Sequence, residues 1–179
     1  FPSSDAAAVV PLPTSREDHP TASGWQSMIE RALGLFRETE LRKVVLARES
    51  VFEFADSLDP AALLRRLARR ADRAYCFCFQ PDEGTAFLGA SPERLYRRHG
   101  RYIESEAVAG TRPRGRSPQE DEALGRELLE SEKDTREHGY VFEALREAFA
   151  LLCGSVQGGQ VDLLPLLECQ HLRCRFEGI

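Results

Sequence analysis

Ile103-Glu-Ser-Glu-Ala-Val-Ala-Gly-Thr-Arg-Pro-Arg-Gly115 is the most informative stretch of the chain. It places a carboxylate, Glu106, four residues before a Gly-Thr turn at 110–111, and a cationic loop follows at once. A carboxyl group can move a proton, while exposed backbone N–H groups and guanidinium groups hold negative oxygens in place. The stretch therefore predicts a site for a small polyanionic substrate.

Length and composition fit an ordinary globular domain. The chain has 179 residues, of which 30% are charged and 42% hydrophobic, and its formal net charge is −5. A chain of this size can bury a core, and a negative net charge does not favour nucleic acid as a partner. The arginine-rich segment 65–73 is interpreted as a solvated helix face rather than a nucleic-acid patch. No apolar run is long enough to span a membrane, so no membrane partner is expected.

The cysteines favour a reducing compartment. There are five of them, and they form no zinc-type pair of Cys-x-x-Cys motifs. Cys76 and Cys78 alternate in an apolar run, where buried free thiols explain them better than disulfides. The N-terminal residues lack the pattern of a signal peptide. We therefore expect a cytoplasmic protein.

The pattern of elements predicts an α+β fold in which antiparallel strands pack with helices. Residues 1–22 are expected to be a linker or an edge segment, and residues 23–179 the folded part. Ser23 is the expected N-cap of a first helix, and Asp59-Pro60 the expected start of a second. A strand is expected over 43–54, and hairpins over 75–89 and 94–104. A long helix is expected from Ser117-Pro118 to about residue 152.

The buried stripe of that long helix is interrupted by polar residues. Ser131, Thr135 and His138 occupy positions where a core helix would carry leucines. Either a wet cavity lies beneath them, or this middle section is exposed between two buried ends. Acidic groups around the same turns could hold a divalent cation, and spacing does not choose between Glu130, Glu132, Asp134 and Glu137.

Three further residues have a structural and a functional interpretation. Lys43 begins an apolar strand, where a lysine usually keeps its amine in solvent; if the amine is partly buried, desolvation makes it a usable base. His171 lies in an apolar segment, where a hydrogen-bonded core histidine is the default interpretation. Glu93 is interpreted as a turn-forming acceptor rather than a catalyst.

Four motifs, in this order, resemble those of the chorismate-utilising enzymes, the isochorismate, anthranilate, aminodeoxychorismate and salicylate synthases. The resemblance extends over about residues 24–179. The motifs are Lys43-Val-Val-Leu-Ala-Arg48, Phe87-Leu-Gly-Ala-Ser-Pro-Glu-Arg-Leu95, Glu106-Ala-Val-Ala-Gly-Thr-Arg-Pro-Arg-Gly115 and Ser131-Glu-Lys-Asp-Thr-Arg-Glu-His138. The resemblance implies a chorismate-binding synthase domain.

Within the family, the combination of Lys43 and Glu106 is most similar to the isochorismate synthases, which are isomerases. The resemblance implies that Lys43 is the general base that activates water and Glu106 the general acid that protonates the departing C4 hydroxyl. It also implies that Gly110, Thr111 and His171 contact the substrate chorismate. Glu137 matches one of the glutamates that bind Mg²⁺.

The resemblance leaves alternatives open. Anthranilate synthases usually have Arg-Pro where this chain has Glu106-Ala107, and salicylate synthases usually have Glu-Pro. Both remain alternatives, as does a non-catalytic module that binds chorismate. The downstream pathway, to menaquinone, a siderophore or salicylate, also stays open.

The family's domain is longer than 179 residues, so a fragment without the C-terminal half is expected. We expect that fragment to be inactive alone and to self-associate through exposed apolar surface.

Overall fold

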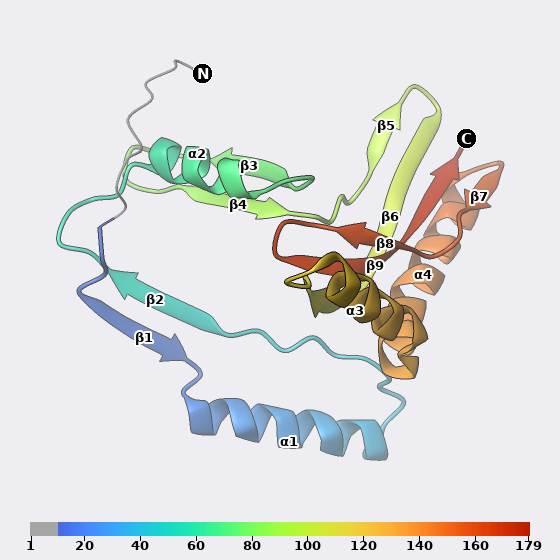
Figure 1. Ribbon diagram of the computed structural model, residues 1–179, viewed down its shortest axis with the longest axis horizontal. Helices are drawn as coiled ribbons and strands as arrows, with labels where there is room; N and C mark the ends of the chain where they lie inside the picture. The colour runs from blue at the N-terminus through green and yellow to red at the C-terminus, as the bar shows by residue number, and fades with distance from the viewer. Residues whose placement is uncertain (1–10) are drawn as a thin grey trace. The chain divides into compact units, whose positions relative to one another are not determined.

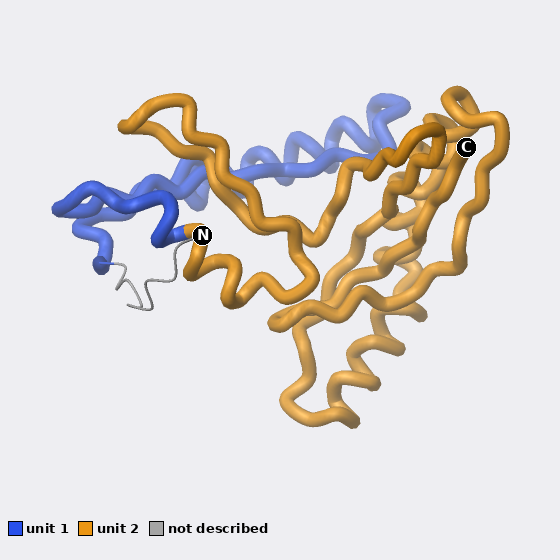
Figure 2. Tube along the Cα trace, turned by 90° about the horizontal axis from the view of Figure 1, so that it is seen from above, with its two compact units in different colours: residues 1–63 blue, residues 64–179 orange. Residues whose placement is uncertain are grey.

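The computed structural model describes residues 11–179. Its helices and antiparallel strands confirm the α+β class (Figure 1). The chain divides into two compact units, one up to Leu63 and one from Leu64 to Ile179 (Figure 2). In the described part of the chain, no helix combines the length and the apolar character that crossing a membrane requires.

The first unit contains a two-stranded antiparallel ribbon and a helix. Strand β1 (Ser15–His19) pairs with β2 (Glu49–Glu53), and helix α1 (Ala22–Glu38) lies between them in the sequence. β1 lies within the segment 1–22 that we expected to be a linker or an edge segment; residues 1–10 of that segment fall outside the described residues. The strand has no apolar alternation, and polar bonds support its pairing, because Ser50 Oγ donates to Asp18 Oδ1 across the ribbon.

Two details of this unit differ from the sequence-based prediction. The N-cap of α1 is Thr21 instead of Ser23, because Thr21 Oγ1 accepts a hydrogen bond from the backbone N–H of Gly24. The strand expected over 43–54 covers only Glu49–Glu53, since β1 pairs with those five residues alone. Within the described residues, 43–48 belong to no strand.

The expected hairpins and helix start are present. Helix α2 (Pro60–Arg70) begins where predicted, and Asp59 Oδ1 accepts from the N–H of Ala61 at 2.8 Å. β3 (Tyr75–Phe79) pairs with β4 (Phe87–Ser91), and β5 (Arg97–His99) pairs with β6 (Tyr102–Pro113). Gly100, in the second turn, has φ +61, which is why a glycine suits that position.

The centre of the second unit is a sheet with the strand order β5-β6-β9-β7, in which β8 also pairs with β9. β7 spans Val156–Gly158, β8 Asp162–Pro165 and β9 Cys169–Gly178. Along β9 every second residue is buried, from Gln170 to Gly178. The core is formed by Ala107 of β6, Cys174 and Phe176 of β9, and Phe149 of helix α4 (Glu132–Leu152). One face of the sheet therefore packs against helices, and the other is left for polar groups.

The long helix predicted over 117–152 is two helices. α3 (Pro118–Glu130) ends at Ser131, and α4 (Glu132–Leu152) begins there. Ser131 has extended backbone angles, φ −69 and ψ 110, and its Oγ accepts from the N–H of Asp134. A serine that can cap the next helix therefore ends one helix and starts another.

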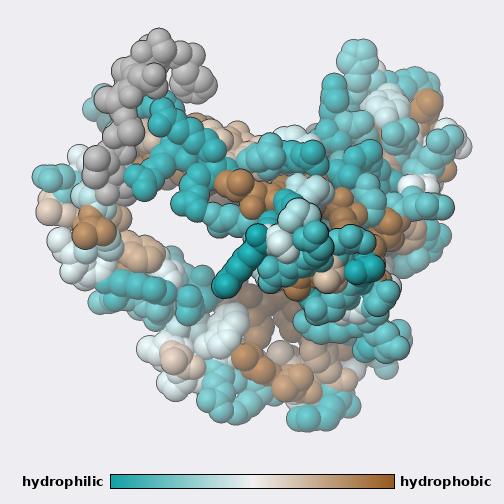
Figure 3. All heavy atoms as spheres, viewed as in Figure 1, coloured by the Kyte–Doolittle hydropathy of each residue, from teal (hydrophilic) through white to brown (hydrophobic). Residues whose placement is uncertain are grey.

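Apolar side chains reach the surface among polar ones (Figure 3). In the β3-β4 hairpin, Phe79 and Phe87 are each 67% exposed, and Cys76 and Cys78 are exposed thiols. The two thiols were expected to be buried. They are exposed, as is every residue of β3, whereas four of the five residues of β4 are half-buried.

Candidate active site

Strand β6 presents Glu106 on the sheet face opposite the helices. Its neighbour Ala107 is fully buried in the core with Phe149, so alternation along the strand directs Glu106 the other way. Glu106 is in register with Arg175 of β9, and its side chain is only 10% exposed. Its Oε1 lies 3.8 Å from Nη2 of Arg94 and 3.8 Å from Nε of Arg175. The predicted acid is therefore a shielded carboxyl group between two guanidinium groups.

Glu106 lines a pocket with a volume of ≈ 450 Å³. Arg73, Arg173 and Arg175 line the same pocket. Arg173 is fixed by Asp162, to which it donates two hydrogen bonds of 2.9 and 2.7 Å, and this pairing raises the pKa of Arg173. The pocket thus combines one carboxyl group with several guanidinium groups, a composition suited to an anionic ligand.

Arg94 was not singled out from the sequence. Its Nη1 lies 2.8 Å from Glu104, and its guanidinium carbon lies 5.7 Å from the centroid of the Tyr75 ring. Arg173 and Arg175 were also missed. Alternation along β9 could have indicated them, because both lie on the face of the strand that carries His171.

The three residues predicted to contact substrate come together at an irregularity of the sheet. The register between β6 and β9 shifts between Ala109 and Thr111, and the residue in between, Gly110, has φ +76. His171 pairs with Thr111 across the strands. Its Nδ1 lies 3.0 Å from Thr111 Oγ1 and 3.1 Å from the Gly110 carbonyl oxygen, and its Nε2 lies 3.4 Å from Cys169 Sγ. Gly110, Thr111 and His171 therefore form one cluster, whose role in binding stays a prediction.

An ion pair between a buried carboxylate and a half-buried arginine lies next to this bulge. Asp134 of α4 is 4% exposed, and its Oδ2 lies 3.0 Å from Nη2 of Arg112. Ser131 Oγ donates to the same oxygen at 2.6 Å, and this bond and the arginine lower the pKa of Asp134. Arg112 also donates to Glu127 of α3 at 2.9 Å. Asp134, one of the four acidic residues considered for a metal, is thus already paired.

The polar residues on the predicted stripe of the long helix differ from one another in how deeply they are buried. His138 is 3% exposed and its Nε2 donates to the carbonyl oxygen of Ala107 at 3.1 Å, whereas Thr135 is exposed. The interpretation as an exposed middle section is therefore wrong for His138, which is buried because it has a backbone acceptor on β6.

The predicted metal ligand and the predicted base have different surroundings. Glu137 is half-buried on α4, and within residues 11–179 no group of three or more His, Cys, Asp or Glu side chains is arranged to hold a metal ion. Lys43 is half-buried in the first unit, whereas Glu106 belongs to the second. The pairing of Lys43 with Glu106 as base and acid stays a prediction.

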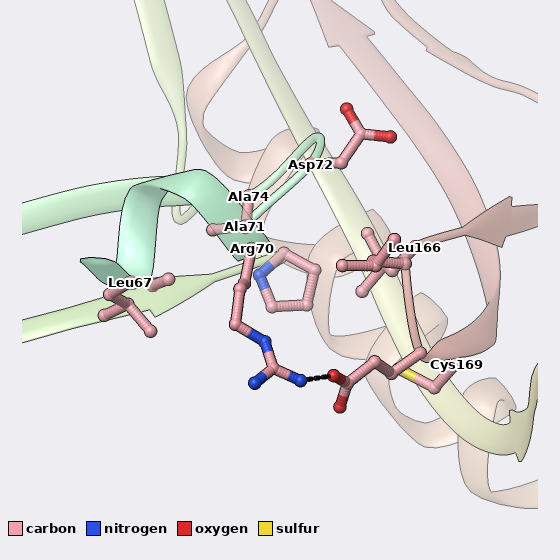
Figure 4. Close-up of a pocket in the computed structure, with 11 residues that line it drawn as sticks. Leu67, Arg70, Ala71, Asp72, Ala74, Leu166 and Cys169 are labelled. Atoms are coloured by element: carbon pink, nitrogen blue, oxygen red, sulfur yellow. Dashed lines mark hydrogen bonds and ion pairs between the residues drawn. The ribbon is translucent and has the colours of Figure 1, made fainter. Parts of the chain in front are cut away.

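A second pocket of the second unit, of ≈ 400 Å³, has a different character (Figure 4). Leu67, Ala71 and Leu166 give it a largely apolar lining, and Arg70 and Glu168 form an ion pair at its wall. Cys169 lines this pocket, and burial raises the pKa of its thiol. None of the predicted site residues lines it, so we place the candidate active site in the pocket of Glu106.

Comparison with known proteins identifies the family. The family described as chorismate binding enzyme matches residues 3–179. The chain belongs to the chorismate-binding enzymes. This confirms the resemblance derived from the four motifs.

The relatives of this chorismate-binding chain include isochorismate synthases of plants and bacteria. It is 35% identical to the chloroplastic isochorismate synthase of Catharanthus roseus over 167 residues, which are 92% of this chain and 29% of that protein. It is 35% identical to isochorismate synthase MenF of Escherichia coli over 172 residues, which are 93% of this chain and 40% of MenF. The chain thus spans less than half the length of these relatives.

A solved structure shows the same fold. The structure of MenF, the menaquinone-specific isochorismate synthase from Escherichia coli, superimposes with a TM-score of 0.87 at 32% identity, covering 95% of this chain and 41% of MenF. A putative 2,3-dihydroxybenzoate-specific isochorismate synthase, DhbC from Bacillus anthracis, gives a TM-score of 0.84 at 29% identity, covering 95% of this chain and 48% of DhbC.

Proposed function

We propose that this chain is part of an isochorismate synthase, which isomerises chorismate to isochorismate. The observation that carries the proposal is the shielded carboxyl of Glu106 in an arginine-lined pocket, within a family that binds chorismate. Chorismate carries two carboxylates, which suit Arg73, Arg173 and Arg175. The relatives named isochorismate synthases support this reaction over the alternatives.

In the proposed reaction, water adds at C2 of the ring and the hydroxyl at C4 leaves. Lys43 takes the proton of the attacking water, and Glu106 gives its proton to the departing hydroxyl, so that a second water is released. The ring double bonds shift between the two positions, and substrate and product have the same composition. His171 and Thr111 would bind polar groups of the ring from the neighbouring bulge.

Mg²⁺ would neutralise a carboxylate of the substrate and orient the ring. Glu137 offers one carboxylate for it, but the described residues do not supply a complete set of ligands.

We also propose that activity requires the remainder of the domain that the relatives possess. The exposed aromatic side chains of the β3-β4 hairpin, among them Phe79 and Phe87, support this, because apolar surface of this kind usually contacts another part of a protein. If such a part is missing, the same surface favours self-association, which light scattering would detect as species larger than a monomer.

Isotope labelling tests the reaction directly. The full-length protein that carries this chain is incubated with chorismate and Mg²⁺ in ¹⁸O-labelled water, and the products are separated and analysed by mass spectrometry. Isochorismate that carries one labelled oxygen is expected. Salicylate with released pyruvate, anthranilate formed only with ammonia, or tight binding without turnover would each contradict the proposal.

Two substitutions test the residue roles. Lys43→Ala and Glu106→Gln are each expected to lower kcat by about 10²- to 10⁴-fold, the usual contribution of a general acid or base. Glu143→Gln is the matched control, because Glu143 is exposed on α4 and pairs with Arg146 there. Unchanged turnover in Lys43→Ala would exclude this lysine as the base.

A further inference from the structure

Arg112 joins three elements of the second unit but has no role in the reaction described above. Its Nε donates to Glu127 of α3, its Nη2 pairs with Asp134 of α4, and its Nη1 donates to the backbone oxygen of Thr111 at 3.0 Å. An ion pair with a buried carboxylate such as Asp134 is weak evidence for stability, because desolvation offsets much of the attraction. Its geometry instead suggests that it fixes one arrangement of the chain.

The arrangement that it fixes is the bulge at Gly110 and Thr111. Arg112 bonds to the carbonyl of Thr111 on one side. On the other side Asp134 lies so close to Gly110 that a Cβ atom at this glycine would be 3.2 Å from the Cβ of Asp134. The ion pair thus contacts both residues of the bulge.

The bulge in turn sets the protonation of His171. Nδ1 of His171 lies 3.1 Å from the Gly110 carbonyl oxygen, and a carbonyl can only accept. This hydrogen bond exists only when Nδ1 carries the proton, so the Gly110 carbonyl favours the neutral tautomer with Nδ1–H and an acceptor at Nε2; Thr111 Oγ1, 3.0 Å from Nδ1, then accepts as well. The thiol of Cys169 lies 3.4 Å from Nε2, and a ligand hydroxyl could take its place. His171 lies on the face of β9 that also carries Arg173 and Arg175 of the Glu106 pocket.

We propose that Arg112 and Asp134 are positioning residues that act through the Gly110–Thr111 bulge. By fixing this bulge they hold His171 as the Nδ1–H tautomer and present its Nε2 to a hydroxyl group of the bound ring acid. The nature of the ligand rests on the proposed function, whereas the tautomer of His171 does not.

The tautomer is measured by two-bond ¹H–¹⁵N correlation spectra of the ¹⁵N-labelled chain, about two units above the ordinary histidine pKa of ~6.5. The chain has four histidines, so His171→Gln identifies the signal of His171. The wild type is expected to show the Nδ1–H pattern, and Arg112→Lys and Asp134→Asn a mixture of both tautomers. Arg146→Lys is the control, because Arg146 forms an exposed ion pair with Glu143 on α4 and has no contact with His171 among the described bonds.

The Nε2–H pattern in the wild type would overturn the proposal, and so would an unchanged Nδ1–H pattern in Arg112→Lys. If Asp134→Asn fails to fold, as judged by circular dichroism, the comparison of Arg112→Lys with the wild type still tests whether the ion pair fixes the tautomer of His171.

Ligand binding is measured separately, by titrating chorismate into the full-length protein. Arg112→Lys is expected to weaken binding about tenfold, the loss of roughly one hydrogen bond to a ligand, and Arg146→Lys to leave it unchanged. Equal losses in both variants would indicate a general structural effect and contradict the positioning role. Absence of chorismate binding in the wild type would overturn the proposed function. The positioning role of Arg112 and Asp134 would then be tested by the tautomer measurement alone.

Discussion

Replacing Gly110 by alanine tests how tightly the bulge beside the candidate site is built. Gly110 has φ +76, and an L-residue in the left-handed region costs about 1–2 kcal/mol. The new Cβ would lie 3.2 Å from the Cβ of Asp134 and 3.3 Å from Cδ1 of Leu128. Leu128 is fully buried and Asp134 is held by two partners, so neither can move freely, and overpacking of this kind costs about 1–3 kcal/mol. The two effects together predict a destabilisation of about 2–5 kcal/mol.

Two other glycines separate these contributions. Gly100 has φ +61 but open space around it, so Gly100→Ala should cost only the backbone part, about 1–2 kcal/mol. Gly139 lies inside α4 with nothing close to its added Cβ, so Gly139→Ala should stabilise the protein by about 0.5–1 kcal/mol.

The assay is urea unfolding followed by far-ultraviolet circular dichroism, with the free energy of unfolding taken from linear extrapolation. The expected order of stability is Gly139→Ala, wild type, Gly100→Ala and Gly110→Ala. A Gly110→Ala variant as stable as Gly100→Ala would refute the reasoning, because the close approach of Asp134 and Leu128 would then impose no penalty.

Three further predictions concern charged and capping groups. Arg114 and the N–H of Gly115 lower the pKa of Asp121 from 3.8 to about 2. Because the pKa of Asp121 is lower in the folded than in the unfolded chain, its stabilising contribution is present above pH 3.8 and is lost as the pH falls toward about 2. Asp121→Asn should therefore flatten the acid limb of a stability–pH curve, and an unchanged limb would contradict this. Arg175→Gln should weaken chorismate binding by the full-length protein about tenfold, as measured by calorimetry. Arg126→Gln changes an exposed residue of α3 and should leave the affinity unchanged. Equal affinities of the two variants would contradict the assignment of the Glu106 pocket as the chorismate site. Ser131→Ala removes the cap of α4 and should lower the free energy of unfolding by about 1–2 kcal/mol in urea, and no loss would show that the cap is dispensable.

The parts of the fold that the sequence predicts are those specified by neighbouring residues. The turn before β4 ends at Gly84, the turn before β6 contains Gly100, and Asp59 precedes the proline that starts α2. Each of these signals acts within a few residues, so no tertiary information is needed. β1 has no such signal: its five charged and polar residues become a strand only because β2, more than 30 residues later, supplies the partner.

The sequence predicted those residues of the candidate site that lie within recognisable motifs, but not the neighbours that strand pairing brings to them. Glu106, Gly110 and Thr111 lie in one motif, and the proximity of Gly110 and Thr111 to His171 follows from the pairing of β6 with β9. Alternation along β9 places Arg173 and Arg175 on the face of His171, but it does not place them beside Glu106, because Arg175 becomes the neighbour of Glu106 through a register that links residues far apart in sequence. Local patterns do not define such a register, since a shift by one residue would place the opposite set of side chains on this face.

The polar stripe of α4 was the clearest anomaly in the sequence, and its explanation lies in β6. Backbone oxygens of β6 accept from side chains: that of Ala107 accepts from His138, and that of Thr111 accepts from Arg112, which is itself paired with Asp134. A buried backbone acceptor needs a partner, and His138 of α4 supplies one for Ala107, which is fully buried. Asp134 of α4 reaches the bulge through its ion pair with Arg112 and through its close approach to Gly110. The buried polar residues of α4 therefore hold β6 at two levels, and one of these is the bulge that carries the candidate binding residues Gly110 and Thr111.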